Sequence, residues 1–379
     1  MTASSTSSPG PHTIAVMGWQ AISHLGLGVD AVRANPTAPV TTLQPAHGDA
    51  ADYPQDIAYR PAAFDVAALL GAKGIRTMDR TTALAVCAAK LLNEDQSIDE
   101  GLSSEQVGFV VGTTTGSIRS TSDFTRDSLV QERPFLVNPA LFPNTVMNCA
   151  AGQCAIRFKA RCVNATISGG RLSGLLALKY ASQMLRRRYA ERLFTGSVEE
   201  LCPQSAWAHR SLVQHGSRHA LPLGEGGAMF SLERSDAALA RGTSPAAHIV
   251  ALQYGRWFDA DTDNAQAAHL SVLAHVQDAL QGVGMAAESL DAAVLCGAAD
   301  AASSPIEQGV AAALLRTGAP VFGLEWVQQL GDTYSATVSL GLAQLLSVLC
   351  GGQTGLILIV GADGHAGCVL VQVPHTSGR

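Results

Sequence analysis

The segment TISGGRLSG, residues 166–174, is followed directly by LLALKYASQML, residues 175–185. β-Branched residues come first, then small residues, then an apolar run with helical spacing, which predicts a strand that turns sharply into a helix. Enzymes use such a turn, an elbow, to present a nucleophile at a helix N-terminus. At the apex of this elbow stands Arg171, whose guanidinium stays protonated and cannot attack a substrate.

The same order of elements recurs later in the chain. A strand-like segment at 192–200 follows the first elbow, and the segment PVFGLEWVQQLGDTYSATVSLGLAQLLSVL at 320–349 is likewise followed by an apolar strand at 355–364. VGFVVGTTTG at 107–116 has a counterpart in DAAVLCGAADA at 291–301. Apolar strands that alternate with helices, in a repeated order, predict a layered α/β protein whose two halves are related by a pseudo-twofold axis.

The repeat suggests how the chain is divided. Residues 1–12 are rich in Ser, Thr and Pro, and we expect them to be a disordered tail. An N-terminal half is predicted over 13–242 and a C-terminal half over 243–379. The segment 33–59 has no clear period and reads as a surface excursion.

Composition excludes several classes of function. The chain of 379 residues is 47% hydrophobic, with a formal charge of −6, which leaves no basic surface typical of nucleic-acid binding. Its apolar runs are shorter than the roughly 20 residues needed to cross a bilayer, so we expect a cytoplasmic protein without a membrane segment. The eight cysteines form no CxxC pair and no cluster with zinc-ligand spacing, so neither a metal nor another cofactor is expected.

Several motifs together resemble the β-ketoacyl synthases, which have the thiolase fold of five layers, αβαβα. The stretch NPALFPNTVMNCAAGQCAIRFKARCVNATISGG at 138–170 resembles the approach to the ketosynthase active site, and GEGGAMFSLERSDAALARG at 224–242 resembles the family's Gly-Glu-Gly segment. TMDRTTALAVCAAKLL at 77–92 and VGFVVGTTTG also stand in the family's order. The resemblance extends over most of the chain from residue 13.

The groups that the family uses for catalysis are replaced. A ketosynthase needs a cysteine at the elbow to hold the acyl chain, and two histidines that stabilise the enolate formed on decarboxylation. The resemblance places Arg171 at the cysteine, Cys296 at the first histidine, Asp332 at the second and Val327 at the family's lysine. Glu307, in the motif that begins at Cys296, is kept.

A retained scaffold with substituted chemistry resembles the chain length factors, the ketosynthase β-subunits of type II polyketide synthases. The resemblance implies a non-catalytic chain that forms a heterodimer with a catalytic ketosynthase α-subunit, shapes its acyl tunnel, and meets an acyl carrier protein through the complex. Chain length factors usually have glutamine at the elbow. Arginine there, and the shorter chain, point to a polyene or aryl-polyene system as much as to an aromatic one.

Arg171 needs a partner, because an unpaired buried guanidinium would cost several kcal/mol. In the duplicated fold the two elbows approach each other at the centre, so Asp332 is the predicted partner, placed where it could also cap its own helix. The alternatives are that Arg171 reaches solvent or pairs with a glutamate such as Glu199. The three arginines at 186–188 read as a solvated helix end, with contact to the carrier protein as the alternative.

Three other side chains could supply a displaced nucleophile, which would make the chain a stand-alone acyltransferase. Cys296 has no histidine nearby in sequence, and Ser168 and Ser173 flank the elbow without a visible general base. Core packing is the favoured interpretation of all three. A dinucleotide-binding oxidoreductase is disfavoured, because no GxGxxG pattern follows the first strand.

The helix predicted after GTTTG places four side chains near one stripe: Ile118, Thr121, Phe124 and Ser128. Such a stripe is usually core or interface. In chain length factors, however, the corresponding segment lies along the acyl tunnel, so the resemblance makes these four residues tunnel candidates and Phe124 the candidate gate. The family's glycine loop near the C-terminus persists in part as GADGHAGCVL, without its phenylalanine.

Overall fold

A computed structural model describes residues 13–33, 41–42, 53–54, 57–61, 64–95, 101–286 and 288–375. The predicted disordered tail, 1–12, and much of the excursion at 33–59 lie outside these residues. Within the described ranges, no helix combines the length and the apolarity needed to cross a bilayer.

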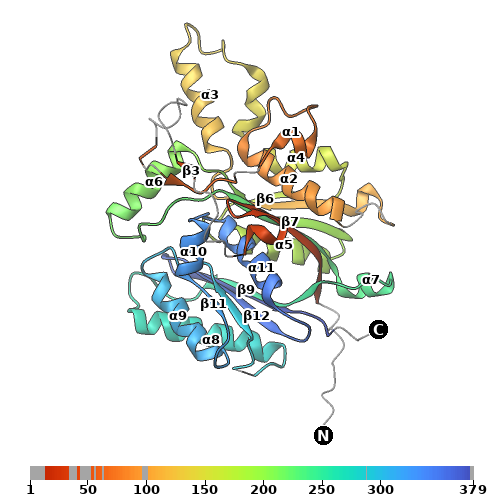
Figure 1. The fold of residues 1–379 in the computed structure, drawn as a ribbon, viewed down its shortest axis with the longest axis vertical. Coiled ribbons are helices and arrows are strands. Elements are labelled where there is room, and N and C mark those ends of the chain that lie inside the picture. Colours follow the sequence, from red (N-terminus) through yellow and green to blue (C-terminus); the bar gives the residue numbers. More distant parts are fainter. Residues whose placement is uncertain are drawn as a thin grey trace.

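One large mixed sheet runs through the molecule (Figure 1). From edge to edge its strands are β11 (Val321–Phe322), β10 (Ala292–Leu295), β12 (Thr354–Val360), β13 (His365–Gln372), β9 (Ala247–Arg256), β1 (Ile14–Ser23), β8 (Gly226–Arg234), β7 (Arg192–Glu199), β5 (Val107–Gly112) and β6 (Asn164–Ile167). The short β2 (Gly26–Leu27) pairs with β1, and β3 (Thr41–Thr42) pairs with β4 (Ile57–Ala58).

The strand order repeats itself about the centre. In one half β6, β5 and β7 are parallel, and β8 and β1 follow antiparallel; in the other half β11, β10 and β12 are parallel, and β13 and β9 follow antiparallel. The halves join where residues 14–16 of β1 pair with residues 247–249 of β9. The repeat found in the sequence is therefore a repeat of structure. The predicted division after residue 242 falls in the connection before β9 and stays a prediction.

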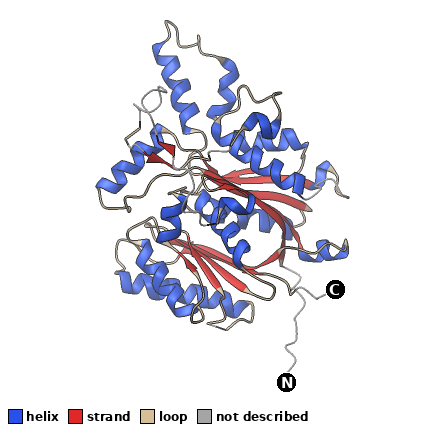
Figure 2. Ribbon diagram, viewed as in Figure 1, coloured by secondary structure: helices blue, strands red, loops and turns tan. Residues whose placement is uncertain are grey.

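Helices form the other layers (Figure 2). Two helices lie between the two halves of the sheet, a second pair covers the outer face of one half, and a third pair covers the outer face of the other. These are respectively α5 (Ser173–Arg186) and α11 (Ala336–Val348), α2 (Arg80–Asp95) and α4 (Cys149–Phe158), and α8 (Ala265–Gly282) and α9 (Ser303–Leu314). This αβαβα arrangement confirms the predicted layered fold.

The central helices explain why the sequence is small and apolar at both elbows. Every residue of α11 from 336 to 345 is buried, as expected for a helix covered on all sides. At the start of α5, a Cβ on Gly174 would lie 2.6 Å from Ser197 Oγ and 2.9 Å from the Ser335 carbonyl oxygen. Only glycine fits there, and its absence of a side chain lets the two elbows meet.

The remaining elements surround this frame. α3 (Ile118–Val130) and the 3₁₀ segment η5 (Pro139–Thr145) pack on each other and project from the body of the molecule (Figure 1). The other short helices are η1 (Gly28–Ala31), α1 (Val66–Leu70), η4 (Ser104–Gln106), α6 (Pro203–Gln214), α7 (Ser235–Ala240) and α10 (Leu324–Leu330).

Candidate functional site

The two elbows meet at a buried ion pair. Arg171, just before α5, donates from Nη2 to Asp332 Oδ2, which lies in the equivalent turn before α11. The Asp332 side chain is fully buried and that of Arg171 is 8% exposed. The predicted pairing is confirmed, and the alternatives in which Arg171 reaches solvent or Glu199 are wrong.

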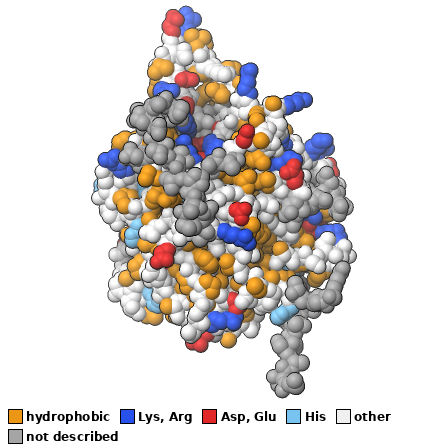
Figure 3. All heavy atoms as spheres, in the orientation of Figure 1, with side chains coloured by type: hydrophobic (Ala, Val, Ile, Leu, Met, Phe, Trp, Pro, Cys, Tyr) orange, Lys and Arg blue, Asp and Glu red, His pale blue; other side chains and the backbone are white. Residues whose placement is uncertain are grey.

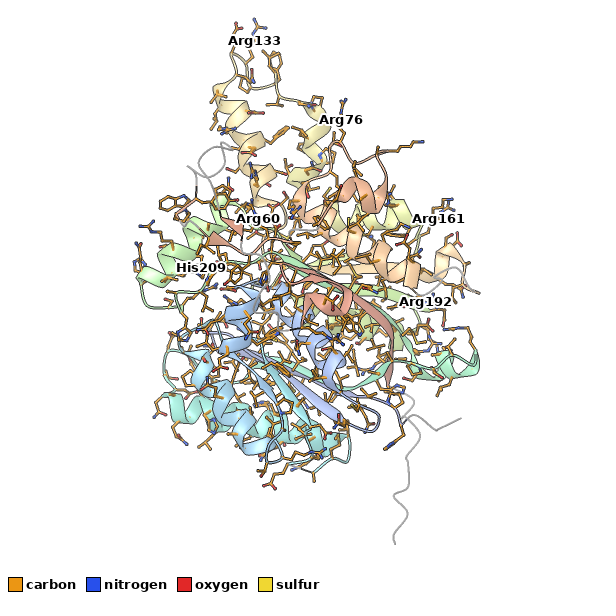
Figure 4. All side chains as sticks on the ribbon, in the orientation of Figure 1. Arg60, Arg76, Arg133, Arg161, Arg192 and His209 are labelled. Carbon is orange, nitrogen blue, oxygen red and sulfur yellow. The ribbon has the colours of Figure 1, made fainter. Side chains whose placement is uncertain are left out.

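Three further residues enclose this pair. Arg218, in the connection from α6 to β8, donates from Nη1 to Asp332 Oδ2 at 3.4 Å. The ring of Tyr334 lies against both guanidinium groups, with centroid distances of 5.0 Å to Arg171 and 4.7 Å to Arg218. His209 of α6, labelled in Figure 4, has its Nδ1 3.7 Å from Asp332 Oδ2. The result is a compact cluster in which two guanidinium groups share one carboxylate.

Charge balance sets the protonation of this cluster. Burial alone would raise the pKa of Asp332, but the adjacent Arg171 and Arg218 outweigh it and hold that pKa below its ordinary value. Burial lowers the pKa of His209 more than the Asp332 charge raises it, so the imidazole stays neutral near pH 7. Its Nε2 lies 3.2 Å from the Leu221 carbonyl oxygen, which fixes the ring. The cluster is therefore a carboxylate shared by two guanidinium groups, beside a neutral histidine.

The expected helix cap by Asp332 is wrong. α11 begins one turn later, with Ser335 at its N-cap position and no side-chain cap. Asp332 Oδ1 instead accepts a hydrogen bond from the Tyr334 backbone N–H at 3.1 Å. The carboxylate therefore stabilises the turn itself, where Tyr334 has a φ of 49°. In this way the elbow is closed locally while the other oxygen remains available to Arg171.

Cys296 lies at the end of β10 and is fully buried. Its Sγ is 3.7 Å from the Thr337 carbonyl oxygen, and burial raises the pKa of the thiol well above its ordinary value. A thiolate is thus disfavoured, which argues against a displaced nucleophile here. Nearby Glu307 accepts hydrogen bonds from the Gly297 and Val360 N–H groups, at 2.9 Å and 2.8 Å, and braces the loop after β10.

The two elbow serines are engaged by backbone groups. Ser168 Oγ donates to the Thr114 carbonyl oxygen at 2.8 Å, and Ser173 Oγ donates to the Gly170 carbonyl oxygen at 2.6 Å. Neither hydroxyl bonds to a histidine or a carboxylate among the described residues. Without a base in contact, a serine hydroxyl is a weak nucleophile.

The tunnel candidates lie on α3, as predicted. None of the α3 side chains is buried in the single chain. Phe124 packs edge-on against Phe142 of η5 with ring centroids 5.8 Å apart, and the Thr121 hydroxyl donates to the Thr145 carbonyl oxygen at 3.3 Å. Ile118 and Ser128 are half-buried, and Ser128 bonds within its own helix. A tunnel lined by these four residues stays a prediction.

Sequence reasoning missed three members of the buried cluster. Tyr334 stands two residues after Asp332, and its place in the second elbow was the one available signal. His209 and Arg218 come from α6 and the connection after it, more than 100 residues before Asp332. No local pattern marks them, because only the fold brings α6 over the elbows.

The chain matches the family model "Beta-ketoacyl synthase, N-terminal domain" over residues 18–238. Among curated proteins, it is 26% identical over 196 residues to a 3-oxoacyl-[acyl-carrier-protein] synthase 2 from Synechocystis, covering 47% of each chain. A second such synthase, from Coxiella burnetii, is 26% identical over 152 residues, which are 40% of this chain and 36% of the relative. The chain therefore spans about half the length, or less, of these curated relatives.

Solved structures match over nearly the whole chain. The ishigamide ketosynthase/chain length factor is 30% identical with a TM-score of 0.80, and the match covers 96% of this chain and 99% of that one. A ketosynthase of a type II polyketide synthase, solved with its acyl-carrier protein, gives a TM-score of 0.77 at 16% identity, covering 96% of this chain and 100% of that one. At that identity the second likeness concerns the fold alone.

Proposed function

This chain belongs to the β-ketoacyl synthase family, and we propose that within it the chain is a non-catalytic chain length factor. In this role it pairs with a catalytic ketosynthase and completes the cavity in which that partner's acyl chain grows. An acyl carrier protein presents the malonyl extender to the acyl chain that the partner's cysteine holds as a thioester.

The buried ion pair is the observation that carries the proposal. The resemblance assigns Arg171 to the position of the family's nucleophile and Asp332 to that of a catalytic histidine, and these two residues form the ion pair. A guanidinium cannot hold an acyl group as a thioester. Replacing Arg171 would also leave the buried Asp332 carboxylate with only the longer contact to Arg218, at 3.4 Å. These groups stabilise the scaffold, so chemistry has to come from a second subunit.

The edge of the sheet supports pairing. β6 is the last strand on its side and bonds only to β5 within the described residues. Hydrogen bonds run from Phe109 N to the Val163 carbonyl oxygen and from Thr113 N to the Ile167 carbonyl oxygen. Because backbone groups alternate in direction along a strand, those of Asn164 and Thr166 face the open edge. An open edge invites a strand from a second chain.

An apolar surface extends over the projecting segments and onto α4. α3, η5, the loop between them and α4 expose large hydrophobic side chains, and Figure 3 shows some of them over α3. They include Leu129, Phe135, Phe142, Met147 and Ile156, of which Leu129 is 78% exposed. Exposed patches of this kind mark interfaces in soluble proteins. Covering it in a heterodimer would also enclose Phe124, which packs against Phe142.

The test is co-expression with a candidate ketosynthase encoded beside this chain. We expect the two to copurify as a 1:1 complex that elongates malonyl-carrier substrates, and neither to do so alone. Thr166→Pro removes one N–H from the open edge and should abolish the complex, whereas Thr166→Val keeps the N–H and should preserve it. A soluble homodimer of this chain that condenses acyl groups by itself would overturn the proposal.

A further inference from the structure

A cleft of about 680 Å³ opens below α3. The start of α3, the start of α2 and the connections that lead into α1, α6 and β8 form its walls. In Figure 3, Lys/Arg and Asp/Glu side chains lie side by side in this region, and Arg60, labelled in Figure 4, belongs to the wall. Neither Arg171 nor Asp332 lines it, so the cleft is separate from the buried cluster.

Most charges in the wall are already balanced. Arg80 donates from Nε to Glu225 Oε1 at 3.0 Å, and Arg119 Nε lies 3.6 Å from Asp123 Oδ2. Arg60 donates to the Leu201 carbonyl oxygen at 3.1 Å. These contacts match two arginines with two carboxylates and direct the third arginine to a neutral acceptor.

Two carboxylates of the wall have no partner of opposite charge among the described residues. Within the described part of the chain, neither Asp79 nor Glu200 forms an ion pair. Glu200 is only 7% exposed, and its Oε1 accepts hydrogen bonds from the Arg119 backbone N–H at 3.2 Å and the Ser117 hydroxyl at 3.4 Å. A carboxylate that is nine-tenths buried, lines a cleft and lacks a cation either takes up a proton or is stabilised, when ionised, by a cation that reaches it.

The rest of the wall is suited to a carbon chain. Pro61, Phe64 and Leu201 contribute apolar surface beside the charged groups. The Phe64 ring is already covered on one side by the Arg80 guanidinium, 4.5 Å from its centroid. A ligand that fits must therefore combine positive charge with a short apolar stem. The volume lies in the range of small-molecule sites.

We propose that this cleft binds a small alkylammonium compound, with its ammonium group against Glu200 and Asp79 and its methylenes against Pro61, Phe64 and Leu201. An anionic ligand is disfavoured against Glu200 and Asp79, because it would add a charge of the same sign there. Arg60 also brings a positive charge to the wall, but it is already bonded to the Leu201 carbonyl oxygen. This site is independent of pairing with a ketosynthase, so its test can fail or succeed without deciding the proposed function.

Three probes of equal chain length separate the contribution of charge. Calorimetric titration of the full-length chain with 1,4-diaminobutane, 1,4-butanediol and succinate should show binding by the diamine alone. Glu200→Gln keeps an amide oxygen for Ser117 and the Arg119 N–H but removes the charge, and it should weaken diamine binding at least tenfold. Glu132→Gln, a substitution at an exposed residue away from the cleft, should leave the affinity for the diamine unchanged.

The pH dependence gives a second readout on the unmutated chain. Burial and the neighbouring Asp79 raise the pKa of Glu200 to about 7, with Glu225 acting in the same direction and the Arg119 N–H against it. The diamine stays charged near neutral pH, since alkylammonium groups titrate near pH 10. Its affinity should therefore fall about tenfold from pH 8 to pH 6, as Glu200 takes up a proton.

If the diamine binds, two results would overturn the proposal. One is equal binding of the diol or succinate and the diamine; the other is diamine binding that neither Glu200→Gln nor acidification weakens. If Glu200→Gln does not fold, the diamine affinities of the unmutated chain at pH 8 and pH 6 test the proposal instead. Absence of diamine binding to the unmutated chain at pH 8 also refutes the site.

Discussion

Arg171 and Asp332 are 161 residues apart in sequence, yet they form one buried ion pair that joins the two halves of the fold. Each stands at the apex of an elbow, and each elbow leads into one of the two central helices. Gly174 permits this approach, because a side chain there would collide with Ser197 and with the Ser335 backbone. The resemblance assigns Arg171 to the position that the family uses for chemistry, and in this chain its side chain forms a contact between the halves.

Asp332→Asn should therefore be strongly destabilising. The substitution leaves Arg171 and Arg218 buried without a carboxylate, and breaking a buried pair in this way costs about 3 to 5 kcal/mol. Urea denaturation followed by circular dichroism would measure the free energy of unfolding. Arg171→Gln combined with Asp332→Asn removes both charges of the pair and should recover part of that loss, while the Arg218 charge stays without its carboxylate. A single Asp332→Asn variant as stable as the unmutated chain would contradict the structural role of the pair.

A second prediction concerns Glu199 at the end of β7. Its Oε1 accepts hydrogen bonds from the Thr114 N–H and, at 2.5 Å, from the Ser335 hydroxyl. Burial nevertheless raises the pKa of Glu199 to about 7. The folded chain then binds this proton more tightly than the unfolded chain, so stability falls as pH rises from about 4.5 to above 7.

Glu199→Gln tests this sign directly. By linkage, a pKa shift of this size lowers the free energy of unfolding by up to about 3 kcal/mol as the pH rises through this range. Denaturation of both chains at pH 5 and pH 8 should show a smaller decline for the variant. Part of the decline should persist, because Glu200 has a similarly raised pKa. An unchanged decline would mean that Glu199 is ionised throughout that range.

A third prediction is that this chain alone forms no acyl-enzyme. Arg171 cannot be acylated as a thioester, and Cys296 is fully buried with its thiol pKa well above the ordinary value. Intact mass after incubation with acyl-carrier or acyl-CoA donors should be unchanged, for the native chain and for Arg171→Ala. A stable mass gain that survives in Arg171→Ala and disappears in Cys296→Ala would instead establish a displaced nucleophile.

Arg171→Cys should not create a working ketosynthase either. Cys296 and Asp332, which the resemblance assigns to the positions of the family's histidines, supply no neutral imidazole for the enolate. His209 is close to Asp332 but is fixed by the Leu221 carbonyl oxygen on its other side. The chain should therefore gain at most a reactive thiol, detectable by alkylation, and no condensation of malonyl-carrier substrates.

A feature of this fold could be predicted from the sequence where a local pattern of residues encodes it. Repeated apolar strands and small-residue elbows are local features, so the layered fold, the two halves and the meeting of Arg171 with Asp332 could be predicted. The charged cleft could not, because Arg60, Asp79 and Glu200 come from three separate connections. The prediction that Asp332 caps α11 was wrong for a local reason. Aspartate accepts hydrogen bonds from helix N-termini and from turns alike, and here Asp332 accepts from the Tyr334 N–H in the turn before α11.

The last prediction concerns Phe124 as the gate of a tunnel shared with a catalytic partner. In the single chain its ring is half-buried and touches Phe142 on the projecting segment, outside the buried core. Truncation to alanine in a packed core would cost about 3 to 5 kcal/mol, but at this site we expect the chain to stay folded and to pair. The complex should then release products longer by one or more two-carbon units.

Mass spectrometry of the products measures this effect. The products of the Phe124→Ala complex are compared with those of the complex that contains the unmutated chain. Leu270→Ala on α8, an exposed truncation at the far end of the molecule, is the matched control and should leave product length unchanged. An unchanged product distribution from a stable Phe124→Ala complex would exclude Phe124 as the gate and make Ile118, Thr121 and Ser128 the next residues to test. Loss of the complex would show that the ring acts in pairing, because it packs with the exposed apolar surface that the partner covers.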